Sequence, residues 1–233
     1  MPDDLNLSPL RDAFARGDLH TANQQAALIL RQDPRNLEAL RALGQIRLFQ
    51  GLWAEAQAFA AQALQVSPDD HAALLLQARI FSAQGRSDDA IEVCDRILAA
   101  EPDSIDTRIA RASVLERVGR IEEAMAVIEP LAGERGGNAN LLARCLLRTG
   151  DTRRAVEIAT EAAARPEVST RERYHLLLLR AKGLDKLGEY DNAMAAAREA
   201  KTLIMPQGFD PAHFTGQVDA LIGAYSRAAI SRF

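Results

Sequence analysis

Glycine recurs in this sequence at a fixed spacing of 34 residues, and no other feature restricts the fold of the chain as strongly. Alanine and proline recur with the same spacing at other places in the period. The three series are Gly17, Gly51, Gly85 and Gly119; Ala22, Ala56, Ala90 and Ala124; and Pro34, Pro68 and Pro102. A constant period of this length indicates one small structural unit that is copied along the chain.

The stretch from residue 37 to residue 70 shows what one unit contains. Apolar and small residues recur every three or four positions in both halves, which predicts two amphipathic helices. Gly51 separates these helices and Pro68 ends the unit. Neither helix can bury its apolar face alone, so each unit needs a copy beside it. The sequence therefore predicts an all-α solenoid, in which abundant alanine allows helices to pack closely.

This pattern resembles the tetratricopeptide repeat (TPR), a helix–turn–helix unit with the same period, a small residue, an alanine and a closing proline. The phase changes after Gly119, because Gly150 follows 31 residues later and Gly188 another 38. The resemblance implies a right-handed solenoid over residues 1–206 and a C-terminal capping helix over residues 207–233. The six predicted repeats are 3–36, 37–70, 71–104, 105–135, 136–168 and 169–206. The sequence departs from the family where Leu or Ile replaces most aromatic residues and where the fourth unit lacks its closing proline.

The glycine-rich segment 133–138 lies where the period loses three residues. A phosphate-binding P-loop would need a lysine followed by Ser or Thr, and the segment has neither. We therefore interpret it as an extended loop, at which the solenoid has room to kink. Pro130 should end the preceding helix early, and Ser169 with Glu172 matches a capping box that opens a longer helix. Ser87 is predicted to cap the second helix of the third unit.

Composition and charge narrow the classes of function. Charged residues make up 26% of the chain and the net charge is −4, which disfavours nucleic acid as a partner because phosphate neutralisation dominates such binding. The N-terminus has no basic and apolar leader, and the longest apolar run, residues 176–179, is too short to span a bilayer. We therefore expect a cytoplasmic protein that does not bind membranes. Cys94 and Cys145 lie within helical stripes and are interpreted as small core residues.

No constellation of acid, base and nucleophile is visible in the sequence. The four histidines lie in different units, and none has a Ser or Cys partner at a known motif spacing; they are His20, His71, His175 and His213. Acidic pairs occur at predicted helix starts, where capping and the helix dipole explain them. We therefore expect no enzyme activity, no metal site and no cofactor.

A binding groove is the better candidate, because in the TPR family one face of each first helix lines the concave side of the solenoid. On that face of this chain, eight basic side chains stand against five acidic ones, with apolar residues between them. Such a face suits an extended peptide with acidic and hydrophobic side chains. The competing interpretation is that the arginines only keep the surface soluble. The candidate peptide-binding residues are Arg11, Arg41, Gln45, Phe49, Leu75, Arg79, Ile109, Arg117, Arg144, Arg148, Leu178, Lys182 and Lys186.

The carboxylate clamp that chaperone-binding TPR domains use for a C-terminal tail looks absent from this chain. That clamp consists of Lys, Asn and Arg side chains at five places in three successive repeats. Here these places hold Leu7, Arg11, Ala42, Ala72 and Leu76. A chaperone tail is therefore not the expected ligand.

The C-terminal part carries a second resemblance. The residues Tyr174, 189–190, 209–213 and 218–222 are similar to the junction that precedes the catalytic domain in bacterial TPR-containing sulfotransferases. In that family a loop with the pattern Pro-x-Ser-Gly-Thr follows and holds the sulfuryl donor PAPS, but no such loop occurs up to Phe233. The resemblance implies that this chain is the repeat part of a longer sulfotransferase and is by itself not catalytic.

Two functions therefore remain open. The first is a non-catalytic scaffold that binds a protein or peptide partner in its groove, with an assembly or secretion-system scaffold as a variant that differs only in the partner. The second is the repeat region of a PAPS-dependent sulfotransferase, used to capture the acceptor or to dimerise. Homodimerisation is compatible with either function.

Overall fold

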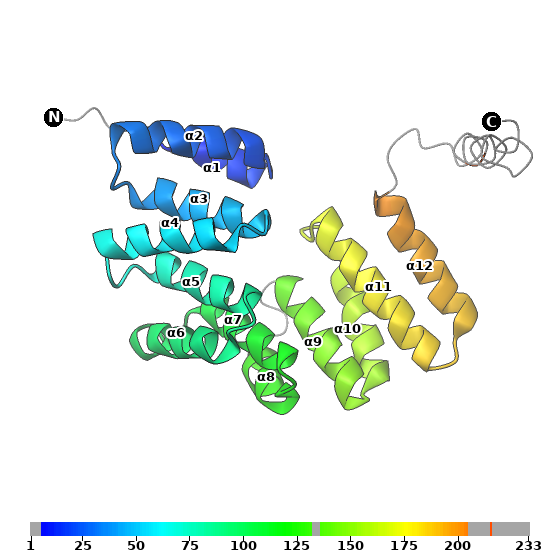
Figure 1. Cartoon of the computed structure of the whole chain (residues 1–233). Coiled ribbons are helices and arrows are strands. Elements are labelled where there is room, and N and C mark those ends of the chain that lie inside the picture. The colour runs from blue at the N-terminus through cyan, green and yellow to red at the C-terminus, as the bar shows by residue number, and fades with distance from the viewer. Residues whose placement is uncertain (1–5, 132–135, 205–214, 216–233) are drawn as a thin grey trace, which may run out of the picture.

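The computed structural model describes residues 6–131, 136–204 and 215, and within them all regular structure is helical. The elements pair in order along the chain into six helix hairpins (Figure 1). They are α1 (Ser8–Ala15), α2 (Leu19–Gln32), α3 (Leu37–Phe49), α4 (Trp53–Val66), α5 (His71–Ala83), α6 (Ser87–Ala100), α7 (Ile105–Arg117), α8 (Ile121–Ile128), η1 (Glu129–Leu131), α9 (Gly136–Thr149), α10 (Thr152–Ala164), α11 (Thr170–Lys186) and α12 (Tyr190–Ile204). Each helix packs on the next one, so the predicted all-α solenoid is confirmed. The predicted capping helix over residues 207–233 lies outside the described residues apart from position 215.

The recurring glycines form the turn between the two helices of each pair. All six adopt a positive φ, from +71° at Gly17 to +96° at Gly150, a conformation that side chains of L-amino acids disfavour. A Cβ added at any of them would meet no atom within 4 Å. The requirement for glycine is therefore a requirement of the backbone and not of packing space.

The recurring alanines lie where the two helices of a pair approach most closely. Ala56, Ala90 and Ala124 have no exposed surface. A Cβ added to Gly44 on α3 would lie 3.5 Å from the Ala56 carbonyl oxygen on α4 and 2.7 Å from Leu76 Cδ2. Glycine at position 44 is thus a condition for the close packing of α3 against Leu76 of α5.

The segment around residues 128–138 joins the fourth pair to the fifth. As predicted, the proline stops α8 at Ile128, and a short 3₁₀ turn follows. Helix α9 begins at Gly136, so the predicted loop 133–138 is too long at its C-terminal end. Figure 1 shows α9–α12 inclined against α1–α4, yet one hydrophobic cluster runs from Ala90 on α6 to Ala155 on α10. The two ends of the stack are thus inclined differently, while one hydrophobic cluster bridges this segment.

Two predicted caps differ from the structure. Helix α6 includes Ser87, and its N-cap is Arg86, which makes no side-chain cap. The N-cap of this helix is the residue that directly follows the turn glycine Gly85, so Arg86 takes this place and Ser87 comes one residue too late. In α2 the residue at the equivalent N-cap position is Asp18. Its carboxylate accepts the Thr21 N–H at 3.0 Å, and this bond lowers the pKa of Asp18.

The capping box at the start of α11 forms only in part. Ser169 Oγ accepts the Glu172 N–H at 3.2 Å, as predicted. The returning bond from the Ser169 N–H is not made, and Glu172 Oε1 is buried without a partner among the described residues.

The hydrophobic core is divided along the stack. Buried side chains form separate clusters, each built from two or more neighbouring helices, such as α1–α3 at the N-terminal end and α9–α12 at the other. No helix of the described chain is long and apolar enough to cross a membrane.

Candidate peptide-binding groove

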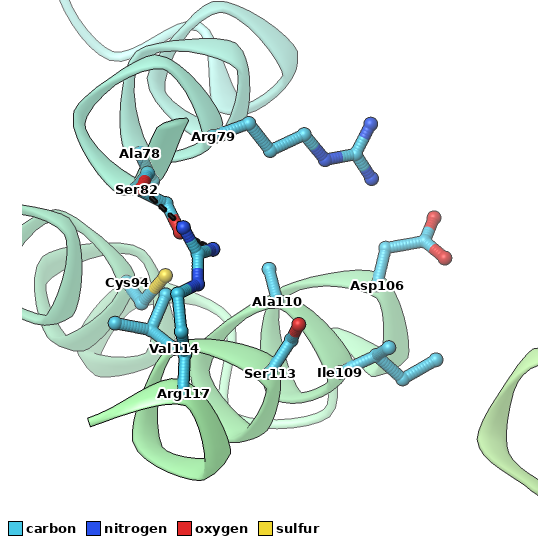
Figure 2. Close-up of a pocket in the computed structure, with 10 residues that line it drawn as sticks. All are labelled: Ala78, Arg79, Ser82, Cys94, Asp106, Ile109, Ala110, Ser113, Val114 and Arg117. Atoms are coloured by element: carbon cyan, nitrogen blue, oxygen red, sulfur yellow. Dashed lines mark hydrogen bonds between the residues drawn. The ribbon is translucent and has the colours of Figure 1, made fainter. Parts of the chain in front are cut away.

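The first helices of the first four pairs form a face with two adjoining hollows. The larger has a volume of about 440 Å³ and is lined by α1, α3 and α5, with a contribution from α7. The smaller, of about 290 Å³, lies between α5 and α7 and is shown in Figure 2. Arg79 and Asp106 line both hollows. The two hollows together offer a path for an extended segment across several repeats.

The larger hollow has an apolar floor and a charged rim. Leu75 and Leu76 are 8% and 6% exposed, and Phe14 on α1 is half-buried beside them. Of the predicted peptide-binding residues, this hollow collects Arg11, Arg41, Gln45, Leu75 and Arg79. The smaller hollow collects Arg79, Ile109 and Arg117.

At the N-terminal end, two of the predicted arginines pair with carboxylates of the following repeat. Arg11 on α1 donates two hydrogen bonds of 2.7 Å to Glu38 on α3, and this contact holds the pKa of Glu38 below its usual value. Arg41 on α3 donates to both oxygens of Asp70, the N-cap of α5, at 3.1 and 3.3 Å. Asp70 also accepts the Ala73 N–H at 2.8 Å, so it joins α3 to the start of α5.

The basic residues farther along the chain repeat this arrangement. Arg117 on α7 donates to the carbonyl oxygen and the hydroxyl of Ser82 on α5. Arg144 and Arg148 on α9 both reach Glu116 on α7, whose side chain is only 13% exposed, at 3.3 and 3.2 Å. Lys186 at the end of α11 donates to the Leu147 carbonyl oxygen of α9 at 2.8 Å.

These contacts form a series that we call the inter-repeat ladder. It joins α1 to α3, α3 to α5, α5 to α7, α7 to α9 and α9 to α11. Six of the eight basic candidates are ladder residues, namely Arg11, Arg41, Arg117, Arg144, Arg148 and Lys186. Only Arg79 and Lys182 make no hydrogen bond or ion pair within the described residues. The sequence count of basic side chains therefore overstates the charge available to a ligand.

Of the apolar candidate residues, some line the two hollows and others lie outside them. Phe49 and Leu178 are 59% and 39% exposed and line neither hollow. Ile109 is half-buried at the wall of the smaller hollow, and Leu75 belongs to the floor of the larger one. The structure thus gathers the candidates of α1, α3, α5 and α7, and separates them from those of α9 and α11.

Replacing Glu116 by Gln should weaken the ladder at its most buried carboxylate. The amide keeps the shape but loses the charge that faces two guanidinium groups, so we expect a loss of about 1–2 kcal/mol in the free energy of unfolding. Urea denaturation measures it. Glu123→Gln is the matched control, because Glu123 pairs only with Arg120 of its own turn at the surface and should leave stability unchanged. Equal midpoints for both variants would show that the ladder contributes nothing.

Sequence reasoning missed a hydrogen-bond network around His71. Its Nδ1 lies 2.7 Å from Glu101 Oε2, and its Nε2 lies 3.0 Å from both Ser104 Oγ and Thr107 Oγ1. The two hydroxyls are 2.8 Å apart, and Thr107 is fully buried. No motif spacing reveals this contact, because it joins the start of α5 to the start of α7.

The order Ser–His–carboxylate in this network is that of hydrolase triads, but its surroundings do not suit that chemistry. Glu101 is 60% exposed, and the adjoining hollow contains the carboxylates of Asp70, Asp103 and Asp106 against the one guanidinium group of Arg41. These negative charges oppose the oxyanion that acyl transfer must stabilise. We interpret the network as a structural tie between the third and fourth pairs.

The two cysteines are buried, as predicted for core residues. Burial raises the pKa of the Cys94 thiol to about 11 and also raises that of Cys145. Both thiols therefore stay protonated and unreactive near neutral pH. Among the described residues, no group of His, Cys, Asp and Glu is arranged to hold a metal ion.

Comparison with known families identifies the repeat. Two family models, both described as tetratricopeptide repeat, match the chain, one over residues 42–105 and 140–207 and the other over residues 81–143. The chain belongs to the tetratricopeptide repeat family. TPR proteins generally mediate interactions between proteins, and their repeats typically form non-catalytic scaffolds. No curated protein matches this TPR chain.

Solved structures share the fold at low sequence identity. A thermophilic TPR protein of Thermus thermophilus is 19% identical, with a TM-score of 0.67 over 76% of this chain and 97% of its own. PilW, a type IV pilus biogenesis factor, is 19% identical, with a TM-score of 0.67 over 99% of both chains. The APC/C hetero-tetramer Cut9–Hcn1 is 18% identical, with a TM-score of 0.75 over 87% of this chain and 40% of its own. These likenesses concern the fold alone, and the sulfotransferase resemblance stays a prediction.

Proposed function

We propose that this TPR chain is a non-catalytic cytoplasmic scaffold, and that the face formed by α1, α3, α5 and α7 binds an extended segment of a partner protein with acidic and apolar side chains. One observation carries the proposal: an apolar hollow of about 440 Å³ opens beside Arg79, an exposed cation that has no partner within the described chain. Apolar side chains of the segment fill the hollow, and a carboxylate pairs with the guanidinium group.

The ladder contributes to the same function. Because its residues form hydrogen bonds and ion pairs with neighbouring repeats, the ladder holds the first helices at a fixed spacing before any ligand binds. A groove that is already formed loses less conformational entropy on binding. The ladder residues are therefore proposed to shape the groove, while Arg79 and the apolar floor contact the ligand.

A bulky side chain placed in the larger hollow should block binding. Ala72 on α5 is exposed and lines this hollow, so Ala72→Trp fills the groove without disturbing the core. Random peptides displayed on phage are selected on the full chain, and the enriched peptides are then titrated against the variant. We expect the affinity to fall by about ten-fold or more, since the apolar contacts of the ligand are displaced.

Ala58→Trp is the matched control for this experiment. Ala58 is exposed on α4, outside both hollows, and receives the same bulky side chain. The control should bind the enriched peptides as the natural chain does. Peptides that bind Ala72→Trp with undiminished affinity would place the binding site elsewhere on the solenoid.

A second candidate is the repeat region of a PAPS-dependent sulfotransferase. Three apolar side chains on α12 favour it, because Tyr190, Met194 and Ile204 are 69%, 56% and 55% exposed on the last described helix. A following domain would cover such a surface. The reading frame beyond Phe233 decides the matter, since this candidate requires a phosphosulfate-binding loop there.

A further inference from the structure

Two oppositely charged pairs occupy equivalent places in the repeat. Arg11 and Glu38 are one pair, and adding two periods, or 68 residues, to each number gives Arg79 and Asp106. The first pair joins α1 to α3, and the second faces across α5 and α7. The comparison is informative because the two pairs hold equivalent places in the repeat and differ in the length of the acidic side chain.

The first pair is closed and the second is open. Arg11 and Glu38 share two hydrogen bonds of 2.7 Å. No hydrogen bond or ion pair joins Arg79 to Asp106, and neither has another partner among the described residues. Figure 2 shows both side chains reaching into the open space of the smaller hollow. Aspartate is one methylene shorter than glutamate, and we infer that this difference keeps the second pair open.

We propose that Arg79 and Asp106 form a charge-pair receptor for a partner segment that carries an acidic and a basic side chain close together. This inference rests on the proposed function and specifies its ligand. The carboxylate of the segment pairs with Arg79, and its ammonium or guanidinium group pairs with Asp106. The pair lies at the boundary of the two hollows, so an apolar side chain of the same segment reaches the floor around Leu75.

The neighbouring charges favour a ligand with both signs. Arg41 pairs with Asp70, and Arg117 is held by hydrogen bonds to Ser82, so among the described residues of these hollows Arg79 is the arginine without a bonding partner. A segment with only carboxylates would satisfy Arg79 but would be repelled by Asp106 beside it. A segment with only cations would pair with Asp106 but would be repelled by Arg79. Opposite charges next to each other satisfy both groups.

The length of the acidic side chain offers a sharp test. Asp106→Glu keeps the charge and adds one methylene, which should let the second pair close as Arg11 and Glu38 do. Peptides enriched by phage display on the natural chain, synthesised with a fluorescent label, are titrated by fluorescence anisotropy. We expect Asp106→Glu to weaken binding about two- to five-fold, the range of an exposed ion pair that competes with the ligand.

Two further variants complete the experiment. Arg79→Gln should weaken binding about ten-fold or more, because a charge-assisted contact is lost, and it should not affect the fold. Asp88→Glu is the matched control, since it adds the same methylene to an exposed aspartate on α6 outside both hollows and should leave affinity unchanged. The enriched peptides should contain acidic and basic residues close together.

The outcomes separate this inference from the proposed function. If Ala72→Trp blocks the peptides while Asp106→Glu or Arg79→Gln binds as the natural chain does, the groove is the binding site and the charge-pair receptor is refuted. An equal loss with Asp88→Glu refutes the receptor as well. If Ala72→Trp has no effect, the proposed function itself fails, and the receptor fails with it.

Discussion

Asn138→Asp is expected to destabilise the protein by about 3–5 kcal/mol at neutral pH, because it buries a charge without a partner. Asn138 lies in the first turn of α9 and has no exposed surface. Its Nδ2 donates to the Leu131 carbonyl oxygen at 3.0 Å, while its Oδ1 is buried without a partner among the described residues. A carboxylate in this place would lose the donor and face a carbonyl oxygen.

The pH dependence of this variant has a definite sign. Burial raises the pKa of the introduced carboxyl above its unfolded value of about 3.9. The loss of stability is therefore small near pH 4, where a protonated carboxyl can still donate to Leu131, and grows as the pH rises. Urea denaturation at both pH values measures it. Asn140→Asp, near Arg144 on the same helix, is the control and should cost little; equal effects at the two positions would contradict the prediction.

Gly183→Leu should destabilise the protein by about 3 kcal/mol through overpacking. Gly183 lies in the middle of α11, where even a Cβ would come within 2.5 Å of Val156 Cγ2 on α10 and 3.5 Å of Leu147 Cδ2 on α9. Valine is stiff at χ1, so it cannot turn away as a longer side chain would. The helices must therefore separate to accept the larger residue.

Thermal or urea denaturation checks this result for three variants: Gly183→Leu, the double variant Gly183→Leu with Val156→Ala, and a control. Val156→Ala removes the obstructing methyl groups, so the double variant should recover part of the lost stability. Ala195→Leu on the exposed face of α12 is the control and should leave the midpoint unchanged. A midpoint for Gly183→Leu equal to that of the control would mean that α10 and α11 do not approach closely at this residue.

The arrangement of helices was predictable because it depends on spacing within one repeat. The recurring glycines predict the turns, the recurring alanines predict the close contacts, and Pro130 predicts the end of α8. The start of α9 was less predictable, because a Gly-Gly sequence is atypical of a helix and the first turn is held by Asn138 across the junction.

The two hollows lie on part of the face that the sequence predicts for a groove, whereas the pairing of its charged side chains was not predictable. Arg79 and Arg144 hold the same place in their repeats, yet Arg144 pairs with Glu116 and Arg79 has no partner. Which arginine is paired depends on the acceptor that a neighbouring repeat offers, and the place of Glu116, three residues before the turn glycine, holds Leu48 in the repeat before Arg79. The contact of His71 with Ser104 has the same origin. The composition and the repeat period therefore do not predict which side chains of different repeats form hydrogen bonds or ion pairs.

The division of the core into clusters along the stack has a consequence for dynamics. Each cluster draws on neighbouring helices, so losing the outermost pair disrupts the cluster that it shares with the adjacent helices and leaves the more distant clusters intact. The helices at the ends can open locally at a lower free energy than those in the middle. Amide hydrogens of α1 and α2 therefore exchange with solvent through partial openings, while those of α6 and α7 require a larger part of the solenoid to unfold.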